Sequence, residues 1–380
     1  MLKRTISVLT VLPVLFSITF VAKGLDSSEL SAVSAVLYYP EGETVLFEKN
    51  SGKQMSMAST TKIMTSLLAL EENTPYREIV ITDSMVNVEG TSSGLRAGDR
   101  ITLLNLVKCM MLESGNDAAN AVAVALGGNV EDFAVMMNNR AKEIGMVNTS
   151  FVTPSGLDNE NHYTTAYDMA LLASEALEDR YFSSVASKKS DKISFDEGAR
   201  SITLYNHNKL LGLYDGCVGI KTGFTKKSGR CLVSAAKRNG VTLVAVTLNA
   251  GDDWNDHIKM FDYGFSCVSS VSADTDFSAY EIRVAGGEKN TVIPVAQECT
   301  LNFLQNGNAE ITRNVYFDRI LFAPVEKGTV VGFAEYMQGG KVIKKIPLVV
   351  NESISVKNIN ENKNIMDRLR SLFDSWWNND

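Results

Sequence analysis

The chain has 380 residues, which is more than one ordinary domain contains, so we expect two folded units. Hydrophobic residues make up 45% and charged residues 21%, a composition that excludes wholesale disorder and a polytopic membrane protein. The formal net charge of −7, with Lys and Arg scattered along the chain, argues against a nucleic-acid-binding protein.

The N-terminus has the pattern of a cleaved export signal. Two basic residues precede an apolar run over residues 6–22, and Ala22-Lys23-Gly24 offers the small residues that signal peptidase requires. Pro13 interrupts the run, which is barely long enough to span a bilayer, so a retained anchor or a buried helix is less favoured. We expect residues 1–24 to be removed and the protein to be exported to the outer face of the cytoplasmic membrane, in the cell-wall space.

Strand patterns at the two ends of the next segment enclose a helical middle. Residues 34–39 and 44–48 predict a hairpin, and further strands are expected at 218–222, 231–236 and 241–248. Helical periodicity runs through residues 59–70, 103–112, 117–126, 130–144 and 165–177, with Gly145 as a helix stop. This order predicts an α+β domain over residues 25–268, in which helices flank one antiparallel sheet.

The rest of the chain predicts a smaller domain and a terminal helix. A Ser- and Asp-rich stretch at 269–278 is a candidate linker, and alternating segments after it predict a small all-β, sandwich-like domain over residues 276–352. Residues 361–380 are too short and too polar to span a membrane, so we expect a helix on the membrane surface; packing against the protein itself is the alternative. Its apolar face would consist of Ile365, Met366, Leu369, Leu372, Phe373, Trp376 and Trp377.

Cysteine and histidine usage does not predict a metal site. The five cysteines are irregularly spaced, define no disulfide framework and include no Cys-x-x-Cys pair. The three histidines lie far apart in sequence. We therefore expect neither a metal nor another cofactor.

The first candidate for chemistry is the run Ser59-Thr60-Thr61-Lys62. A serine hydroxyl needs a neighbouring base to become a nucleophile, and a lysine can be that base when its amine is deprotonated. Residues three apart lie on the same face of a helix, so the Lys62 amine can reach the Ser59 hydroxyl. Alone this spacing is weak, because Ser-x-x-Lys occurs by chance in many helix starts.

Two further short patterns make the set specific. Ser114-Gly115-Asn116 lies between two predicted helices, and Lys221-Thr222-Gly223 ends a predicted strand. These three patterns in this order characterise the penicillin-recognising serine enzymes. The chain resembles one family among them, the low-molecular-mass penicillin-binding proteins that are D-alanyl-D-alanine carboxypeptidases. The resemblance covers roughly residues 30–265 and extends to Pro154-Ser155-Gly156-Leu157-Asp158.

The resemblance implies a fold, a reaction and a set of roles. The fold would be a β-lactamase/transpeptidase-like catalytic domain plus the small all-β domain. The substrates would be peptidoglycan stem peptides ending in D-Ala-D-Ala, and β-lactams would be covalent inhibitors. The implied roles are Ser59 as nucleophile, Lys62 as base, Ser114 as proton relay, Asn116, Lys221, Thr222 and Gly223 as substrate-binding residues, and the backbone N–H groups of Ser59 and Phe224 as the oxyanion hole.

One segment departs from the pattern of some family members, which carry an arginine there for the substrate carboxylate. Here residues 252–257 read Asp-Asp-Trp-Asn-Asp-His, which we interpret as a solvated loop. Carboxylate recognition would then rest on Thr222 with Lys221 or Arg230.

Four other functions remain as alternatives. A D,D-endopeptidase would use the same catalytic group in a differently shaped cleft. A class A β-lactamase would need a deacylating glutamate, and no convincing Glu-x-x-Leu-Asn is present. A catalytically silent wall-binding protein is disfavoured by the intact motifs, and a Ser-His-Asp hydrolase by the absence of a Gly-x-Ser-x-Gly sequence.

Overall fold

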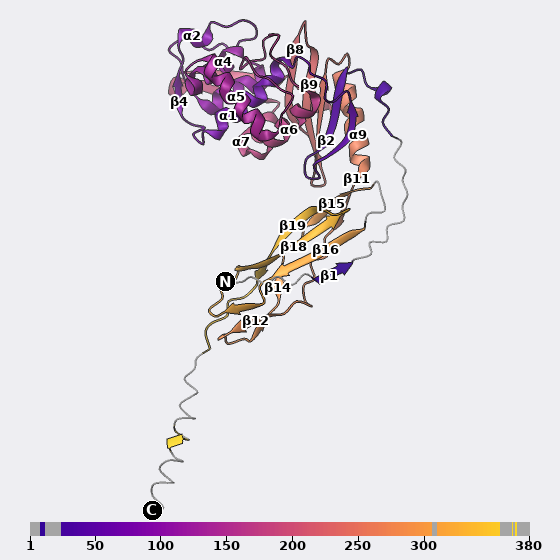
Figure 1. Ribbon diagram of the computed structural model, residues 1–380. Coiled ribbons are helices and arrows are strands. Elements are labelled where there is room, and N and C mark those ends of the chain that lie inside the picture. Colours follow the sequence, from indigo (N-terminus) through magenta and orange to yellow (C-terminus); the bar gives the residue numbers. More distant parts are fainter. Residues whose placement is uncertain (1–7, 12–23, 306–309, 358–366, 368, 371–380) are drawn as a thin grey trace, which may run out of the picture. The chain divides into compact units, whose positions relative to one another are not determined.

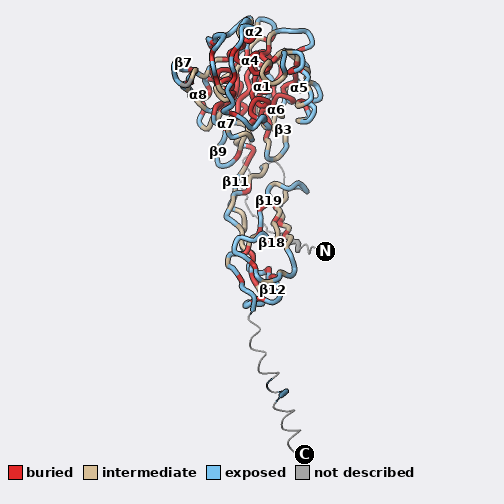
Figure 2. The backbone as a smooth tube through the Cα atoms, turned by 90° about the vertical axis from the view of Figure 1, so that its left-hand side faces the viewer, coloured by how far each residue is buried: buried red, intermediate tan, exposed pale blue. Residues whose placement is uncertain are grey.

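The computed structural model describes residues 8–11, 24–305, 310–357, 367, 369 and 370. The chain divides into two compact units, Thr19–Ser269 and Met1–Ile18 together with Ser270–Asp380 (Figure 1). Figure 2 shows that buried residues are concentrated inside each unit, and the two hydrophobic clusters share no residue. Each unit therefore has its own core.

A five-stranded antiparallel sheet organises the larger unit, in the order β3-β2-β10-β9-β8. Its strands come from the beginning and end of the unit: β2 (Ser34–Tyr39), β3 (Thr44–Lys49), β8 (Cys217–Thr225), β9 (Gly229–Arg238) and β10 (Val241–Leu248). The predicted hairpins and strands are thus confirmed. The last helix of the unit, α9 (Asp253–Cys267), lies on the face of the sheet opposite to the other helices (Figure 1). Because β8 is an edge strand, one of its sides is open to a neighbour other than β9.

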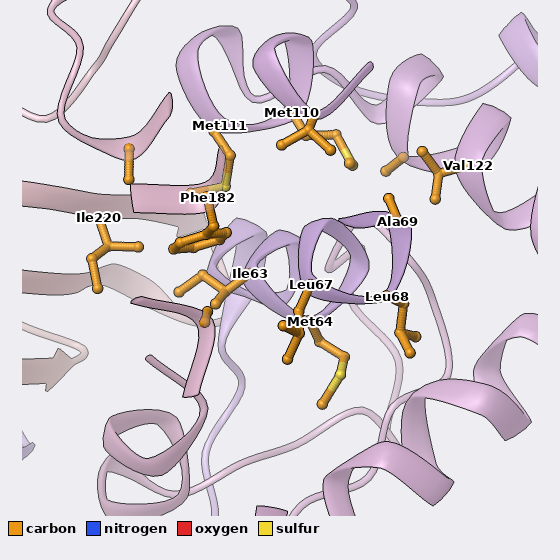
Figure 3. Packing of buried hydrophobic residues seen from close by; sticks show 14 of the residues in the cluster. Ile63, Met64, Leu67, Leu68, Ala69, Met110, Met111, Val122, Phe182 and Ile220 are labelled. Carbon is orange, nitrogen blue, oxygen red and sulfur yellow. The ribbon is translucent and has the colours of Figure 1, made fainter. Parts of the chain in front are cut away.

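The helices on the other face begin with a short 3-10 turn, Ala58–Thr61, which leads into α1 (Lys62–Glu71). Nine of the ten α1 residues are buried, and Figure 3 shows Ile63, Met64 and Leu67 inside the cluster that Met111, Phe182 and Ile220 complete. The helices around α1 are α3 (Leu103–Lys108), α4 (Asn116–Gly127), α5 (Val130–Ile144), α6 (Ala166–Glu178) and α7 (Arg180–Ala186). This packing fixes the start of α1, where the first motif lies.

The predicted helices are confirmed with local differences. Gly145 ends α5 in the left-handed conformation that favours glycine, as expected. The helix expected over 103–112 instead changes into a π-helical turn at Cys109–Glu113, which delivers Ser114 in a left-handed conformation. Short elements absent from the sequence prediction are α2 (Asp83–Val86), α8 (Leu210–Leu213) and the hairpins of β4 (Glu78–Val80) with β5 (Arg100–Thr102) and of β6 (Ser190–Phe195) with β7 (Arg200–Tyr205).

The smaller unit is built from strands around a core that includes Val315, Tyr336 and Leu348. Its largest sheet has the order β1-β16-β18-β19-β14, and smaller sheets are β13-β12-β17 and β11-β15. The strands are β1 (Val8–Val11), β11 (Val268–Ser272), β12 (Ile282–Ala285), β13 (Thr291–Val292), β14 (Pro294–Val295), β15 (Thr300–Leu304), β16 (Ile311–Phe317), β17 (Ile320–Phe322), β18 (Val330–Gln338) and β19 (Lys341–Val350). An antiparallel catalytic fold followed by an all-β unit confirms the expected fold class.

Three sequence expectations meet the structure only in part. Residues 8–11 of the expected export signal pair with β16, and most of the signal lies outside the described residues. The candidate linker at 269–278 begins as strand β11. The expected terminal helix lies outside the described residues, except that residues 367, 369 and 370 are helical and exposed.

All five cysteines are free thiols. Burial raises the pKa of Cys109 to about 12 and that of Cys231 to about 11, so both stay protonated at neutral pH. Among the described helices, none is both long enough and apolar enough to cross a membrane.

Candidate active site

Ser59 lies in the 3-10 turn at the start of α1, and Lys62 is the first residue of that helix. The Lys62 Nζ atom is 3.0 Å from Ser59 Oγ, so the spacing seen in the sequence does bring these two side chains together. Ala58, the residue before Ser59, has a φ of 48°, in the left-handed region that non-glycine residues rarely occupy. The turn therefore presents Ser59 at the cost of a strained neighbour.

Lys62 is fully buried among groups that accept hydrogen bonds. Its Nζ atom lies 2.7 Å from Asn116 Oδ1 and 2.7 Å from the carbonyl oxygen of Ser155. Burial, and after it the positive charge of Lys221, hold the pKa of Lys62 well below its ordinary value, although Asp117 opposes the shift. A neutral amine donates its two hydrogens to these two oxygens and keeps its lone pair for the Ser59 hydroxyl.

The second motif begins where the π-helical turn ends. Ser114 has a φ of 64° and is 8% exposed, and Asn116 is the first residue of α4. The Asn116 side chain connects two parts of the site, because its Oδ1 accepts from Lys62 and its Nδ2 donates to the carbonyl of Glu89 at 2.7 Å. Asn116, expected to bind substrate, thus also orients the base.

The third motif lies on the edge strand β8. Lys221 is buried, its Nζ donates to the carbonyl of Thr222 at 3.0 Å, and burial lowers its pKa to about 7. A Cβ atom on Gly223 would lie 3.0 Å from the amide nitrogen of Ser59, so glycine lets β8 pass close to the turn that carries Ser59 without displacing it. Phe224 follows with an exposed side chain. The structure thus brings Ser59, Lys62, Asn116 and the β8 residues into one site.

The site also uses groups that the sequence motifs do not reveal. The carbonyl of Ser155 binds Lys62, and a Cβ atom on Gly156 would collide with the carbonyl of Ala58 at 1.9 Å. A backbone carbonyl is present in every residue, so the residue types do not reveal this contact. Only the family resemblance, which extends to Pro154-Ser155-Gly156, pointed to this segment. Buried His162 was likewise given no role.

The interpretation of residues 252–257 as a solvated loop is wrong. They form the start of α9, where Asp253, Asp256 and His257 are buried. Asp256 accepts hydrogen bonds from the backbone amides of Ser31 and Ala32, each at 2.9 Å. These partners are more than 220 positions away in the chain, so local composition gave no hint of them.

Arg230 is already engaged with this helix. Its Nε atom donates to Asp253 Oδ1 at 3.0 Å, its Nη2 atom contacts the same oxygen, and its guanidinium lies over the Trp254 ring. The Arg230 guanidinium is thus engaged in an ion pair, while its side chain stays 42% exposed.

A cavity of about 800 Å³ lies elsewhere in the larger unit, lined by residues that include Tyr38, Leu171 and Val218. None of the three motifs contributes to it, so we place the chemistry at Ser59 and not in this cavity. Within the described residues, no group of three or more His, Cys, Asp or Glu side chains is arranged to hold a metal ion.

Comparisons with known proteins agree with this geometry. The family model for D-alanyl-D-alanine carboxypeptidase matches residues 21–252, and the model for the C-terminal domain of penicillin-binding protein 5 matches residues 265–355. The chain is 29% identical over 344 residues to D-alanyl-D-alanine carboxypeptidase DacF of Bacillus subtilis, covering 87% of the chain and 88% of the relative. It is 32% identical to DacC of Escherichia coli, covering 83% and 82%.

Solved structures give the same result. The D-alanyl-D-alanine carboxypeptidase DacD from Francisella tularensis superposes with a TM-score of 0.63 at 26% identity, covering 90% of this chain and 97% of that one. The Streptomyces K15 DD-transpeptidase gives a TM-score of 0.59 at 30% identity, covering 62% of this chain and 98% of that one.

Proposed function

The chain belongs to the D-alanyl-D-alanine carboxypeptidase family, and from this premise we propose which of its residues perform the reaction and where in the cell it takes place. It is a serine-type enzyme that removes the terminal D-alanine from peptidoglycan stem peptides through an acyl-enzyme and is acylated by penicillin. Ser59 is the proposed nucleophile, Lys62 its base and Ser114 the proton relay.

The acylation step follows from the contacts of Lys62. Its neutral amine takes the Ser59 proton while the Ser59 oxygen attacks the carbonyl carbon of the penultimate D-alanine. The negative charge on the carbonyl oxygen is met by the backbone N–H groups of Ser59 and Phe224. Ser114 passes the proton that Lys62 took from Ser59 on to the departing D-alanine amine. Water, deprotonated by Lys62, then attacks the acyl carbonyl carbon, the bond to Ser59 Oγ breaks, and Ser59 regains its proton as the shortened peptide leaves.

Substrate binding is assigned to the groups around this centre. Thr222 and the positive charge of Lys221 hold the terminal carboxylate, Asn116 binds the peptide, and Gly223 leaves room for it along β8. The pairing of Arg230 with Asp253 supports this choice over Arg230.

The observation that carries this assignment is the 3.0 Å contact between Lys62 Nζ and Ser59 Oγ inside a buried set of acceptors. It is tested by intact-protein mass after incubation with benzylpenicillin, combined with D-alanine release from a peptide ending in D-Ala-D-Ala. We expect one penicilloyl adduct on the mature chain and none on Ser59→Ala, whereas Ser201→Ala, a change at an exposed serine, retains adduct and activity. An adduct on Ser59→Ala would refute the assignment.

We further propose that the mature protein acts outside the cytoplasmic membrane and is held at its surface by residues 361–380. The export pattern at residues 1–24 and the apolar helix face that the sequence predicts, ending in Trp376 and Trp377, support this. A third support lies in the smaller unit, close to Lys357. There the apolar side chains of Ile320, Phe322 and Val356 are 50%, 73% and 51% exposed, as in a surface that contacts a membrane.

Co-sedimentation with liposomes tests membrane binding. We expect residues 25–380 to pellet with anionic liposomes and residues 25–360 to stay in solution. In the full chain, Trp376→Ser with Trp377→Ser should weaken binding, and the neighbouring changes Asn378→Ser with Asn379→Ser should not. Equal pelleting of the long and short chains would refute the proposal.

A further inference from the structure

His162 lies directly behind the turn that carries Ser59, and no step of the reaction above uses it. It is 3% exposed. Its Nε2 atom lies 2.8 Å from the hydroxyl of Thr61, and its Nδ1 atom accepts a hydrogen bond from the backbone N–H of Val152 at 3.0 Å. Both ring nitrogens are therefore engaged, one with the nucleophile turn and the other with the segment around residues 152–156.

The direction of these hydrogen bonds is fixed. A backbone N–H can only donate, so Nδ1 carries the lone pair and the neutral ring carries its hydrogen on Nε2. Burial lowers the pKa of His162 to about 4, which keeps the ring neutral at physiological pH. His162 Nε2 then donates to Thr61 Oγ1, and the Thr61 hydroxyl donates to the carbonyl of Ala58 at 2.8 Å.

The chain of hydrogen bonds ends on the strained residue next to the nucleophile. Ala58 keeps its φ of 48° because contacts with its surroundings hold the backbone in this conformation. The hydrogen bond from the Thr61 hydroxyl to the Ala58 carbonyl is one of these contacts. The other side of the ring holds the backbone of Val152, three residues before Ser155, whose carbonyl binds Lys62. One imidazole thus connects the turn that carries Ser59 with the segment that orients its base.

We propose that His162 is a positioning residue for acylation: through Thr61 and Ala58 it fixes where Ser59 Oγ lies relative to Lys62 Nζ. The inference rests on the proposed role of Ser59 as nucleophile. It makes a specific claim, that the link to Thr61 matters for the rate and not merely for the stability of the fold.

Two substitutions separate the two sides of the ring. Asparagine at 162 places an oxygen near the position of Nδ1 and keeps the acceptor for Val152, but is too short to reach Thr61. Glutamine reaches further and can keep a donor toward Thr61. Thr61→Val removes the hydroxyl that links His162 to Ala58, and Thr61→Ser keeps a hydroxyl there. These two variants form a second pair that leaves His162 intact.

The measurement is the second-order rate constant for acylation by benzylpenicillin, followed by intact mass, together with kcat and KM for D-alanine release and the melting temperature. We expect His162→Asn and Thr61→Val to slow acylation by about 10- to 100-fold, since small misplacements of reacting groups cost this much. KM should change little. His162→Gln and Thr61→Ser should keep most of the rate.

A second buried histidine provides the matched control. His257 is fully buried and its Nε2 atom lies 3.0 Å from the Thr247 hydroxyl, at the opposite face of the sheet from Ser59. His257→Asn and Thr247→Val should lower the melting temperature and leave acylation of the folded protein unchanged.

Three results would overturn the inference. The first is acylation at the unmodified rate in folded Thr61→Val or His162→Asn. The second is that Thr61→Ser and His162→Gln slow acylation as much as Thr61→Val and His162→Asn do. The third is that the His257 and Thr247 controls slow acylation equally at the same loss of melting temperature. Failure of the proposed function looks different, because the unmodified chain itself would then form no adduct on Ser59.

Discussion

Two lysines, Lys62 and Lys221, lie buried in the candidate site, and burial lowers the pKa of each. Lys221 lowers the pKa of Lys62 by placing a positive charge near it, in addition to the effect of burial. In the proposed mechanism acylation requires the neutral form of Lys62, so the acylation rate should rise with pH through the pKa of this amine.

Replacing Lys221 with methionine removes that positive charge. The pKa of Lys62 should rise, because its protonated form is no longer repelled, and the rising limb of the acylation rate against pH should move to higher pH. The measurement is the benzylpenicillin acylation rate from pH 5 to 10. Lys226→Met, at an exposed lysine of the β8–β9 turn, is the control and should leave the limb in place. A limb that stays in place or moves to lower pH in Lys221→Met would contradict the predicted repulsion between the two amines.

At the scale of elements, the site depends on how closely the segment around Gly156 packs on the nucleophile turn. Gly156 has a φ of +89°, and a Cβ atom there would lie 1.9 Å from the carbonyl oxygen of Ala58. Alanine at this position must therefore both accept an unfavourable backbone conformation and push the turn away.

We expect Gly156→Ala to lower the free energy of unfolding by more than about 1–3 kcal/mol, the usual cost of one strained backbone position, and to slow acylation as well. The measurements are urea unfolding and the acylation rate. Gly128→Ala is a matched control: its φ is +80° but no atom lies within 4 Å of the added Cβ. It should show the backbone cost alone, with normal acylation. Similar effects of both changes would mean that contact with Ala58 is unimportant.

The same elements show what the sequence could and could not predict. The spacing of Ser59 and Lys62 predicted their contact because three residues make almost one helical turn, and Gly145 predicted a helix end because few residues adopt its conformation. The π-helical turn at Cys109–Glu113 was missed because its apolar residues continue the spacing of α3. The burial of Asp256 was missed because the amides of Ser31 and Ala32 that satisfy it lie far away in the chain.

At the scale of the whole molecule, the two units have separate cores. Separate cores allow separate unfolding, and a ligand bound covalently in one of them stabilises only that one. We therefore expect two thermal transitions in the full chain, of which benzylpenicillin raises only one.

Calorimetry with and without benzylpenicillin tests this. Gly332→Ala assigns the other transition, because its Cβ atom would lie 2.1 Å from the carbonyl of Tyr316 and should destabilise the smaller unit alone. One transition that shifts as a whole in both experiments would show that the units unfold together.

The five free thiols have a consequence for the conditions under which the protein can work. No disulfide between these cysteines has to form for this fold to be reached. In the folded protein, the burial that raises the pKa values of Cys109 and Cys231 leaves little thiolate at neutral pH, which slows the reaction of these two thiols with oxidants. The export proposed above would therefore place no demand on a thiol oxidase or a disulfide isomerase.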